Sequence, residues 1–156
     1  MIKFSRNNYP SFSNFHIAPI VFQGLTYSSS EAAFQSMKTI DYEERLQFTQ
    51  LSPSVAKKMG KKVRLRQDWE EIKYPIMVEI CYAKFTQNTA LKYLLLHTGD
   101  EEIIENTTAW HDNIWGNCEC PKCVYIDGQN LLGKALMEVR ARIRKEEKEK
   151  EMKNEN

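Results

Sequence analysis

Residues 28–38 read SSSEAAFQSMK, and this stretch predicts the start of the helical part of the chain. Glu31, Gln35 and Lys38 are separated by four and three residues, and such steps return to the same side of a helix. An acid, an amide and an amine are therefore expected to line one polar strip. Three apolar residues are expected beside or behind that strip as the buried face: Phe34, Met37 and Ile40.

This polar strip has a structural and a catalytic interpretation. Ser28 and Glu31 have the spacing of a capping box, in which the carboxylate satisfies backbone N–H groups at the start of a helix. A carboxylate and an ammonium group on one helix can also supply a proton, a stabilising charge or a nucleophilic amine. The window alone favours the structural interpretation, so a catalytic role depends on residues elsewhere in the chain.

The composition is that of an ordinary globular protein. The 156 residues, 42% of them apolar, are enough for one domain with a buried core. A net charge of +1 gives no long-range field that would favour nucleic acid or a membrane as the main partner. The N-terminus has no apolar run of the signal-peptide type, and the most apolar segment, residues 91–96, is too short to span a bilayer. We expect a cytoplasmic protein without a membrane partner.

Strand signals lie near the N-terminus, and helical signals follow. Residues 2–4 read as a short strand and residues 19–27 as a hairpin that turns at Gln23-Gly24. Helices are predicted from residue 28, over 53–60, over 68–85 with a capping box at Asp68 and Glu71 and a kink at Pro75, over 88–98, and from about residue 129. The predicted fold is mainly α: a single compact helical domain over residues 1–144 with a small N-terminal β element. Residues 145–156 are predicted to be a charged, fraying helical tail, with partner binding as the alternative.

The stretch Trp110–Gly116 is the second candidate site. It falls between helical segments, where functional groups are often positioned. Asp112 suits a general base or a charge stabiliser, Trp115 suits stacking on a base or a ribose, and Gly116 allows a ligand to approach the backbone. A packed turn with an aromatic plug is the structural alternative.

Two further stretches suit phosphate. Glycines at the start of the last predicted helix suggest phosphate binding by backbone amides near Gly133, with an ordinary N-cap at Asn130 as the competing interpretation. Residues 57–66 carry six cations, which suit either a phosphate group or a solvated helix end. Arg66 beside Trp69 combines a guanidinium with an indole, a pair that suits a phosphorylated, ring-bearing ligand.

The cysteines leave two interpretations open. Cys120 and Cys123 have the spacing of half a tetrahedral zinc site, and Cys118 suits a third ligand. The fourth ligand would come from Cys81, His111 or Asp127. The second Cys-x2-Cys pair of common zinc sites is missing, so free thiols in a surface loop are favoured and no cofactor is expected.

The order of these motifs resembles the NADAR family, the YbiA-like N-glycosidases. The resemblance extends from about Phe4 to Arg140 and leaves out only the charged tail. It rests on Phe12-Ser13-Asn14-Phe15, Ser30-Glu31-x-x-Phe34-Gln35-x-x-Lys38, Ser52-Pro53, Arg66-x-x-Trp69-x-x-x-Lys73, Met77, Lys84-Phe85, Leu94-Leu95-Leu96-x-Thr98-Gly99, Glu105, Asp112-x-x-Trp115-Gly116 and Gly128-x-Asn130-x-Leu132-Gly133-x-x-Leu136-Met137-x-x-Arg140. Residues 118–123 depart from the shortest family members, which lack these cysteines.

The resemblance implies a mainly helical enzyme that cleaves N-glycosidic bonds between ribose and an exocyclic nitrogen. It implies catalytic roles for Glu31, Lys38 and Asp112. The expected substrate-binding residues are Arg6, Asn14, Phe15, Tyr27, Gln35, Arg66, Trp69, Trp115, Gly116, Asn130 and Gly133.

The resemblance implies two substrate classes. One is ADP-ribose attached to guanine, in a nucleotide or a nucleic acid, and the other is a phosphoribosylamino-pyrimidine intermediate of riboflavin biosynthesis. The first is favoured because the cations of residues 57–64 suit an approach for nucleic acid. A module that only binds ADP-ribose or a nucleotide, and a general nucleic-acid binder, are the alternatives without catalysis.

Overall fold

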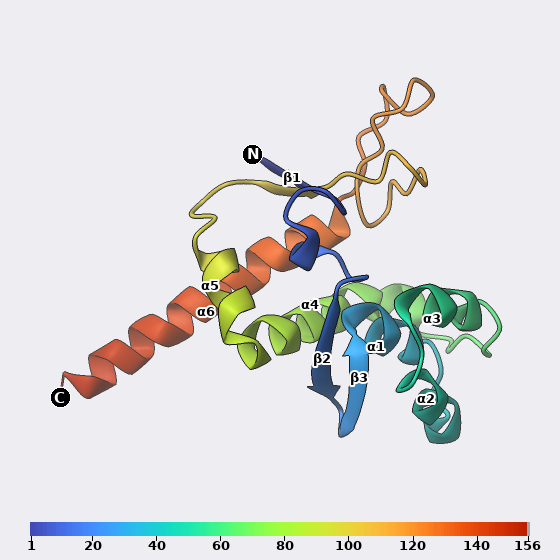
Figure 1. The fold of residues 1–156 in the computed structure, drawn as a ribbon, viewed down its shortest axis with the longest axis horizontal. Coiled ribbons are helices and arrows are strands. Elements are labelled where there is room, and N and C mark those ends of the chain that lie inside the picture. Colours follow the sequence, from blue (N-terminus) through green and yellow to red (C-terminus); the bar gives the residue numbers. More distant parts are fainter. Residues whose placement is uncertain (156) are drawn as a thin grey trace.

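Two long helices pack against each other in the computed structural model, which describes residues 1–155 (Figure 1). They are α4 (Trp69–Gln87) and α6 (Leu131–Asn154). Their contact faces are apolar at steps of three and four residues, as an amphipathic helix requires. Leu132, Leu136, Val139 and Ile143 bury this face on α6.

Three short helices lie along the chain between the N-terminal strands and α4. They are α1 (Ser30–Ser36), α2 (Tyr42–Phe48) and α3 (Pro53–Gly60). Helix α1 is buried along its whole length and contacts both α3 and α4. It is therefore the scaffold that joins the short helices to the long pair.

The predicted capping box at the start of α1 is wrong. Ser29 is the N-cap, and its hydroxyl oxygen accepts a hydrogen bond from the Ala32 N–H at 3.1 Å. The Ser28 hydroxyl instead donates to the Leu51 carbonyl at 2.8 Å. The carboxylate of Glu31 is thus free of a capping role.

Helix α1 is also shorter than predicted. It ends at Ser36, so Lys38 lies just past its end rather than on its polar strip. Ile40 was predicted to be buried but is 75% exposed, because the helical spacing no longer applies at that position. Phe34 and Met37 are buried as predicted.

Two pairs of strands complete the fold within residues 1–155. β2 (Ile17–Phe22) and β3 (Leu25–Ser29) form the predicted antiparallel hairpin, with Gln23 and Gly24 at positive φ in its turn. β1 (Ile2–Phe4) is also confirmed, and it pairs in parallel with β4 (Ile103–Glu105). Strand β4 was not predicted, because three residues are too few to show a period.

Other predicted helix signals are partly confirmed. α3 begins after the predicted cap Ser52, and α5 (Thr89–Leu96) precedes Gly99, whose φ of +64° supplies the left-handed residue of its C-terminal turn. The capping box at Asp68 is wrong, because its side chain makes no cap and pairs with Arg66 instead. Helix α2 was missed.

Helix α6 carries the charged tail. It passes residue 144 without a break and continues to Asn154, so the tail is helical as predicted. Asn156, the last residue of the predicted tail, lies outside the described residues. Among residues 1–155, no helix combines the length and the apolar character needed to cross a membrane. The fold is mainly α with small sheets, as predicted from the sequence.

Candidate active site

A cavity of about 620 Å³ lies among α1, α3, the start of α4 and the loops that precede β2 and α6. This volume is within the usual range for small-molecule sites. Four carboxyl groups line it: Glu31 from α1, Glu70 from the start of α4, Glu105 from β4, and Asp112 from the loop that follows β4. Glu70 forms an ion pair with Lys73 at 2.7 Å. The cavity thus gathers acids that are far apart in sequence.

Glu31 is a buried carboxyl group with one protein partner. Its Oε1 accepts a hydrogen bond from Gln35 Nε2 at 2.8 Å, and the residue is 7% exposed. Burial raises the pKa of Glu31 above its ordinary value, and the nearby charge of Asp112 adds to this. The Gln35 hydrogen bond and the charges of Lys57 and Lys38 act in the opposite direction.

Gln35 is held in place by the close approach of α1 and α3. A Cβ atom at Gly60 of α3 would lie 1.9 Å from Gln35 Oε1, so only glycine leaves room for this amide. Among residues 1–155, this Oε1 has no hydrogen-bond partner. The packing therefore directs the NH₂ group of Gln35 toward the carboxylate of Glu31.

Glu105 is a second buried acid of the cavity whose pKa is raised. It is 8% exposed, and burial together with the charges of Asp112 and Glu31 raises its pKa to about 8. Its backbone N–H donates to Asn130 Oδ1 at 3.0 Å, while Asn130 Nδ2 donates to the Ile103 carbonyl at 2.8 Å. The backbone of Glu105 is therefore held in place, and a pKa of about 8 favours the protonated carboxyl group at pH 7.

This pKa makes the stability of the protein depend on pH. Between about pH 5 and pH 8 the folded chain keeps a proton on Glu105 that the unfolded chain has lost, so stability falls as the pH rises. In Glu105→Gln, which mimics the neutral form, we expect a flatter dependence and a higher melting temperature than the wild type above pH 8. Thermal unfolding from pH 5 to pH 9 measures this. The exposed neighbour Glu102, changed to Gln, is the matched control. An unchanged slope in Glu105→Gln would show that the carboxyl group is already ionised at neutral pH.

Asp112 is positioned by its own loop. Its Oδ1 accepts hydrogen bonds from the backbone N–H groups of Ile114 at 2.8 Å and Trp115 at 2.9 Å. Its carbonyl accepts from the Thr107 hydroxyl at 2.5 Å. Because both bonds to Oδ1 come from the backbone, the carboxylate is fixed relative to its own turn.

Aromatic side chains form one wall of the cavity. The ring centroid of Phe34 lies 5.0 Å from that of Trp69 and 5.0 Å from that of Trp115, with an edge-on arrangement toward Trp115. The Nζ of Lys38 lies 5.9 Å from the Trp69 ring centroid. Such a wall offers stacking surfaces for a flat heterocycle.

Lys38 is half-buried at the cavity, in the turn after α1. Burial lowers the pKa of its ammonium group, and Glu31 partly opposes this effect. Its carbonyl accepts from the Arg66 N–H at 2.8 Å, and the Arg66 guanidinium donates to the Met37 carbonyl at 3.4 Å. Arg66 therefore positions the turn that carries Lys38.

The loop before β2 also lines the cavity, with Ser13, Asn14 and Phe15. The buried ammonium group of Lys84 donates to the Ser13 carbonyl at 2.9 Å, and burial lowers its pKa to about 8. The Asn14 carbonyl accepts from the Glu31 N–H at 3.1 Å, which ties this loop to α1. The ring of Phe15 has the Cζ of Arg6 and the Nζ of Lys57 at 5.9 Å from its centroid. A cation and an aromatic ring are thus presented together.

The structure brings most of the predicted site residues to this cavity. Those that line it are Glu31, Lys38, Asp112, Arg6, Asn14, Phe15, Gln35, Trp69 and Trp115. Five others do not line it: Tyr27, Arg66, Gly116, Asn130 and Gly133.

These five residues support the cavity from outside. Tyr27 is fully buried and its hydroxyl accepts from Ser36, while Arg66 pairs with Asp68 at 2.7 Å. A Cβ at Gly116 or Gly133 would collide with backbone, so these glycines allow close packing of the loop and α6 against β4.

The expected phosphate site at the start of α6 is wrong. The N–H groups of Asn130, Leu131 and Leu132 donate to the carbonyls of Gly116, Ile114 and Trp115. These amides are therefore occupied by the chain itself. Asn130 does not cap the helix with its side chain either, and its φ of +51° is left-handed.

Two groups of cavity residues were missed as site residues. Glu105 was part of the family pattern but received no role, because its strand was not predicted. The other group is a set of lysines, which the sequence showed only as part of a basic run or a motif: Lys57, Lys58, Lys61 and Lys73.

Comparison with known proteins identifies the family. The model of the NADAR domain matches residues 3–144 of the chain. The chain belongs to the NADAR family. This NADAR domain is 36% identical over 140 residues to N-glycosidase YbiA of Escherichia coli, a match that covers 88% of this chain and 83% of YbiA.

Structural comparison agrees with the sequence match. The NMR structure of E. coli YbiA superposes with a TM-score of 0.81 at 34% identity, covering 94% of this NADAR domain and 86% of YbiA. The riboflavin biosynthesis protein VVA0006 of Vibrio vulnificus is 33% identical over 141 residues, which cover 87% of this chain and 36% of that longer protein. The resemblance stated from the sequence motifs is thus confirmed.

Proposed function

We propose that this NADAR domain is an N-glycosidase that hydrolyses the bond between C1′ of a ribose and an exocyclic nitrogen. The observation that carries the proposal is the convergence of Glu31, Glu105, Asp112 and Lys38 on one cavity. The membership of the family and the name of YbiA as an N-glycosidase support it.

Cleavage of the N-glycosidic bond requires groups that stabilise positive charge at C1′. Breaking the bond to nitrogen builds positive charge on this carbon, and a nearby carboxylate lowers the barrier. The leaving nitrogen needs a proton, and Glu105 keeps one at neutral pH because its pKa is about 8. Asp112 and Glu31 are then the candidates for stabilising charge and activating water.

Lys38 offers a route that an exocyclic N-glycoside makes available. Ring opening of such a ribose gives an imine between C1′ and the exocyclic nitrogen. The neutral amine of Lys38 attacks C1′, its bond to C1′ forms, and the free heterocyclic amine leaves after taking a proton from a cavity carboxyl group. Water then hydrolyses the Lys38 Schiff base and releases the ribose aldehyde.

Direct displacement is the alternative route. Water activated by Glu31 or Asp112 attacks an oxocarbenium-like C1′, and Lys38 then only binds a ribose or phosphate oxygen. The lowered pKa of Lys38 favours the amine route, because an amine with a lower pKa is neutral, and therefore nucleophilic, for a larger fraction of the time.

For the substrate, we propose ADP-ribosylated guanine, as a nucleotide or within a nucleic acid. Lys57, Lys58 and Lys61 of the cavity suit the charge of a diphosphate. The wall formed by Phe34, Trp69 and Trp115 suits a flat base. A phosphoribosylamino-pyrimidine shares these features, and the similarity to the Vibrio riboflavin biosynthesis protein favours it as the second candidate.

The cations of residues 57–64 form two groups, one in the cavity and one outside it, and this difference distinguishes a nucleic-acid substrate from a small molecule. Lys57, Lys58 and Lys61 line the cavity, whereas Lys62 and Arg64 are exposed outside it. On ADP-ribosylated single-stranded DNA, we expect the double variant Lys62→Gln, Arg64→Gln to slow turnover. We also expect the slope of log affinity against log salt concentration to become shallower by about two. Release of ADP-ribose measures this.

The same variant is compared on ADP-ribosylguanosine and on the riboflavin-pathway intermediate. No change is expected with either small molecule, while neutralising Lys57 and Lys58 slows every reaction. Faster turnover of the pyrimidine intermediate than of any guanine substrate would assign the domain to the second class. Tight binding of ADP-ribose without turnover of any substrate would indicate a binding module. Salt-sensitive binding of unmodified DNA without turnover would indicate a nucleic-acid binder.

A further inference from the structure

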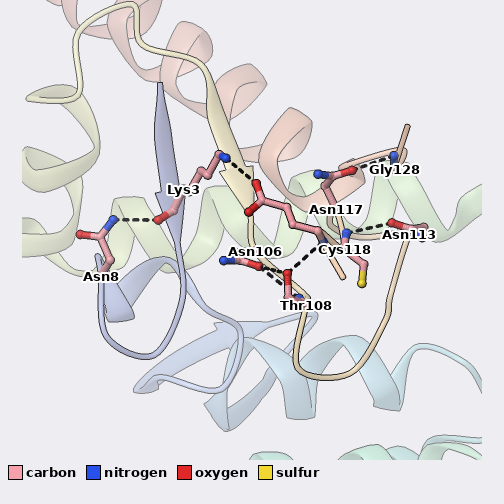
Figure 2. A network of polar contacts seen from close by, with 9 residues as sticks. Lys3, Asn8, Asn106, Thr108, Asn113, Asn117, Cys118 and Gly128 are labelled. Carbon is pink, nitrogen blue, oxygen red and sulfur yellow. Dashed lines mark hydrogen bonds and ion pairs between the residues drawn. The ribbon is translucent and has the colours of Figure 1, made fainter. Parts of the chain in front are cut away.

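The loop between β4 and α6 is long and has few regular elements, but hydrogen bonds and an ion pair hold its base. It extends away from the two long helices (Figure 1). The Cys118 N–H donates to Asn113 Oδ1 at 2.9 Å, and the Gly128 N–H donates to Asn117 Oδ1 at 2.9 Å (Figure 2). Lys3 of β1 forms an ion pair with Glu119. The base of the loop is therefore held in one conformation.

Four metal-binding side chains converge within this loop. The ligand atoms of His111, Cys118, Cys120 and Cys123 all lie within 4.8 Å of one another. The Nδ1 of His111 lies 3.2 Å from Cys118 Sγ. A zinc ion bound about 2.3 Å from each sulfur places tetrahedral ligand atoms about 3.8 Å apart, so the cluster has the dimensions of a zinc site.

We propose that His111, Cys118, Cys120 and Cys123 bind one zinc ion in a structural, tetrahedral site. The sequence favoured free thiols because it showed three cysteines and only half of a common motif. The structure supplies the fourth ligand, His111, from the other side of the loop. Four protein ligands fill a tetrahedral site, which is the arrangement of structural rather than catalytic zinc.

The backbone around the cluster also suits thiolate ligands. The Cys120 N–H points at Cys118 Sγ at 3.5 Å, and the Cys123 N–H donates to the Cys120 carbonyl at 2.9 Å, which forms a tight turn between these two ligands. N–H groups directed at sulfur are common partners of metal-bound thiolates. His111 has a φ of +59°, a costly conformation for this residue, and a metal bond offsets such a cost.

The zinc site would act on the catalytic cavity through sequence neighbours of His111. Trp110 precedes this histidine and Asp112 follows it, and both line the cavity. The N–H groups of Trp110 and His111 both donate to the Thr107 carbonyl, which holds these two residues in one turn. Zinc bound to His111 therefore fixes the segment that presents Asp112, which gives the metal a positioning role.

The first experiment measures metal content. Full-length protein produced with zinc in the medium and purified without chelator is expected to contain about one zinc per chain by elemental analysis. His111→Asn and Cys123→Ser are each expected to lower the content to background. Cys81→Ala and His97→Gln, which change the same residue types outside the cluster, are matched controls and are expected to keep the metal.

A second measurement reports the ligands directly. Cobalt(II) added to the zinc-free, reduced protein is expected to give the intense visible absorption of a tetrahedral thiolate site, and Cys123→Ser is expected to weaken it. Native thiol titration is expected to find the three loop cysteines protected until a chelator is added. A strong chelator is also expected to lower the melting temperature of the wild type but not of Cys123→Ser.

Three results would overturn the proposal. The first is a reduced wild-type protein that binds neither zinc nor cobalt. The second is zinc content that is the same in His111→Asn and Cys123→Ser as in the controls. The third is a disulfide between two of the loop cysteines in protein purified under reducing conditions, found by mass spectrometry. Each of these results is independent of turnover, so failure of the zinc site is distinguishable from failure of the N-glycosidase proposal.

Discussion

Glu31→Gln is expected to lower kcat by about 10²–10⁴-fold on the substrate that the domain turns over, the range for loss of a positioned acid or base. The change keeps the shape of the side chain and removes its charge, which leaves C1′ without this stabilising carboxylate. KM is expected to change little, because the loss affects the transition state more than the bound ground state. Steady-state kinetics of base release provide the measurement.

Ser29→Ala is the matched control for this experiment. Ser29 supplies the actual cap of α1, and its removal is expected to cost about 1 kcal/mol of stability without a comparable loss of kcat. The two variants therefore separate helix capping from catalysis within the first turn of one helix. A large decrease in the melting temperature of Glu31→Gln, together with nearly normal turnover by the folded fraction, would show that Glu31 has a structural role instead.

Lys38→Met is expected to give the second large loss, about 10³-fold in kcat, and to abolish covalent trapping. In the wild type, borohydride added during turnover is expected to reduce the Schiff base and leave a ribose adduct on Lys38, found by peptide mass spectrometry. Lys38→Arg is expected to be as inactive as Lys38→Met, because guanidinium keeps the charge but is not a nucleophile.

The adjacent cation Lys57 provides the control. Lys57→Met removes a half-buried cavity charge, and its adduct on Lys38 is expected to form as in the wild type, with weaker substrate binding. Borohydride without substrate is expected to leave Lys38 unmodified. Substantial activity in Lys38→Arg, without an adduct in the wild type, would establish direct displacement by water.

Local signals predicted much of the helical fold. Proline and serine at 52–53 predicted the start of α3, and glycine at 99 predicted the end of α5, because each residue type suits one backbone position. The capping residue of α1 was placed wrongly, because several candidate caps stand next to each other at 28–30. Asp68 was placed correctly at the start of α4, but its side chain pairs with Arg66 instead of capping the helix. Local patterns do not rank such competing partners.

The candidate site was predicted where chemistry depended on residue type, and missed where it depended on distant contacts. Glu31 and Asp112 were recognised by their motifs, and both line the cavity. Glu105 was overlooked because its burial arises from the pairing of β4 with β1 and from Asn130. His111 was one of three candidates for the fourth ligand of the cysteines, and the loop conformation, which no spacing rule contains, places it beside them.

The parallel pairing of β1 with β4 has a consequence for how the protein is made. Ile2 pairs with Ile103, so β1 leaves the ribosome well before its partner strand β4. Contacts between such distant residues form late, because the intervening chain must be ordered first. Glu105 and Asp112 join Glu31 only at that stage. The cavity proposed as the active site is therefore not assembled in the nascent chain before β4 pairs with β1. Because β1 has only three residues, the strand edge that it exposes before this pairing is short.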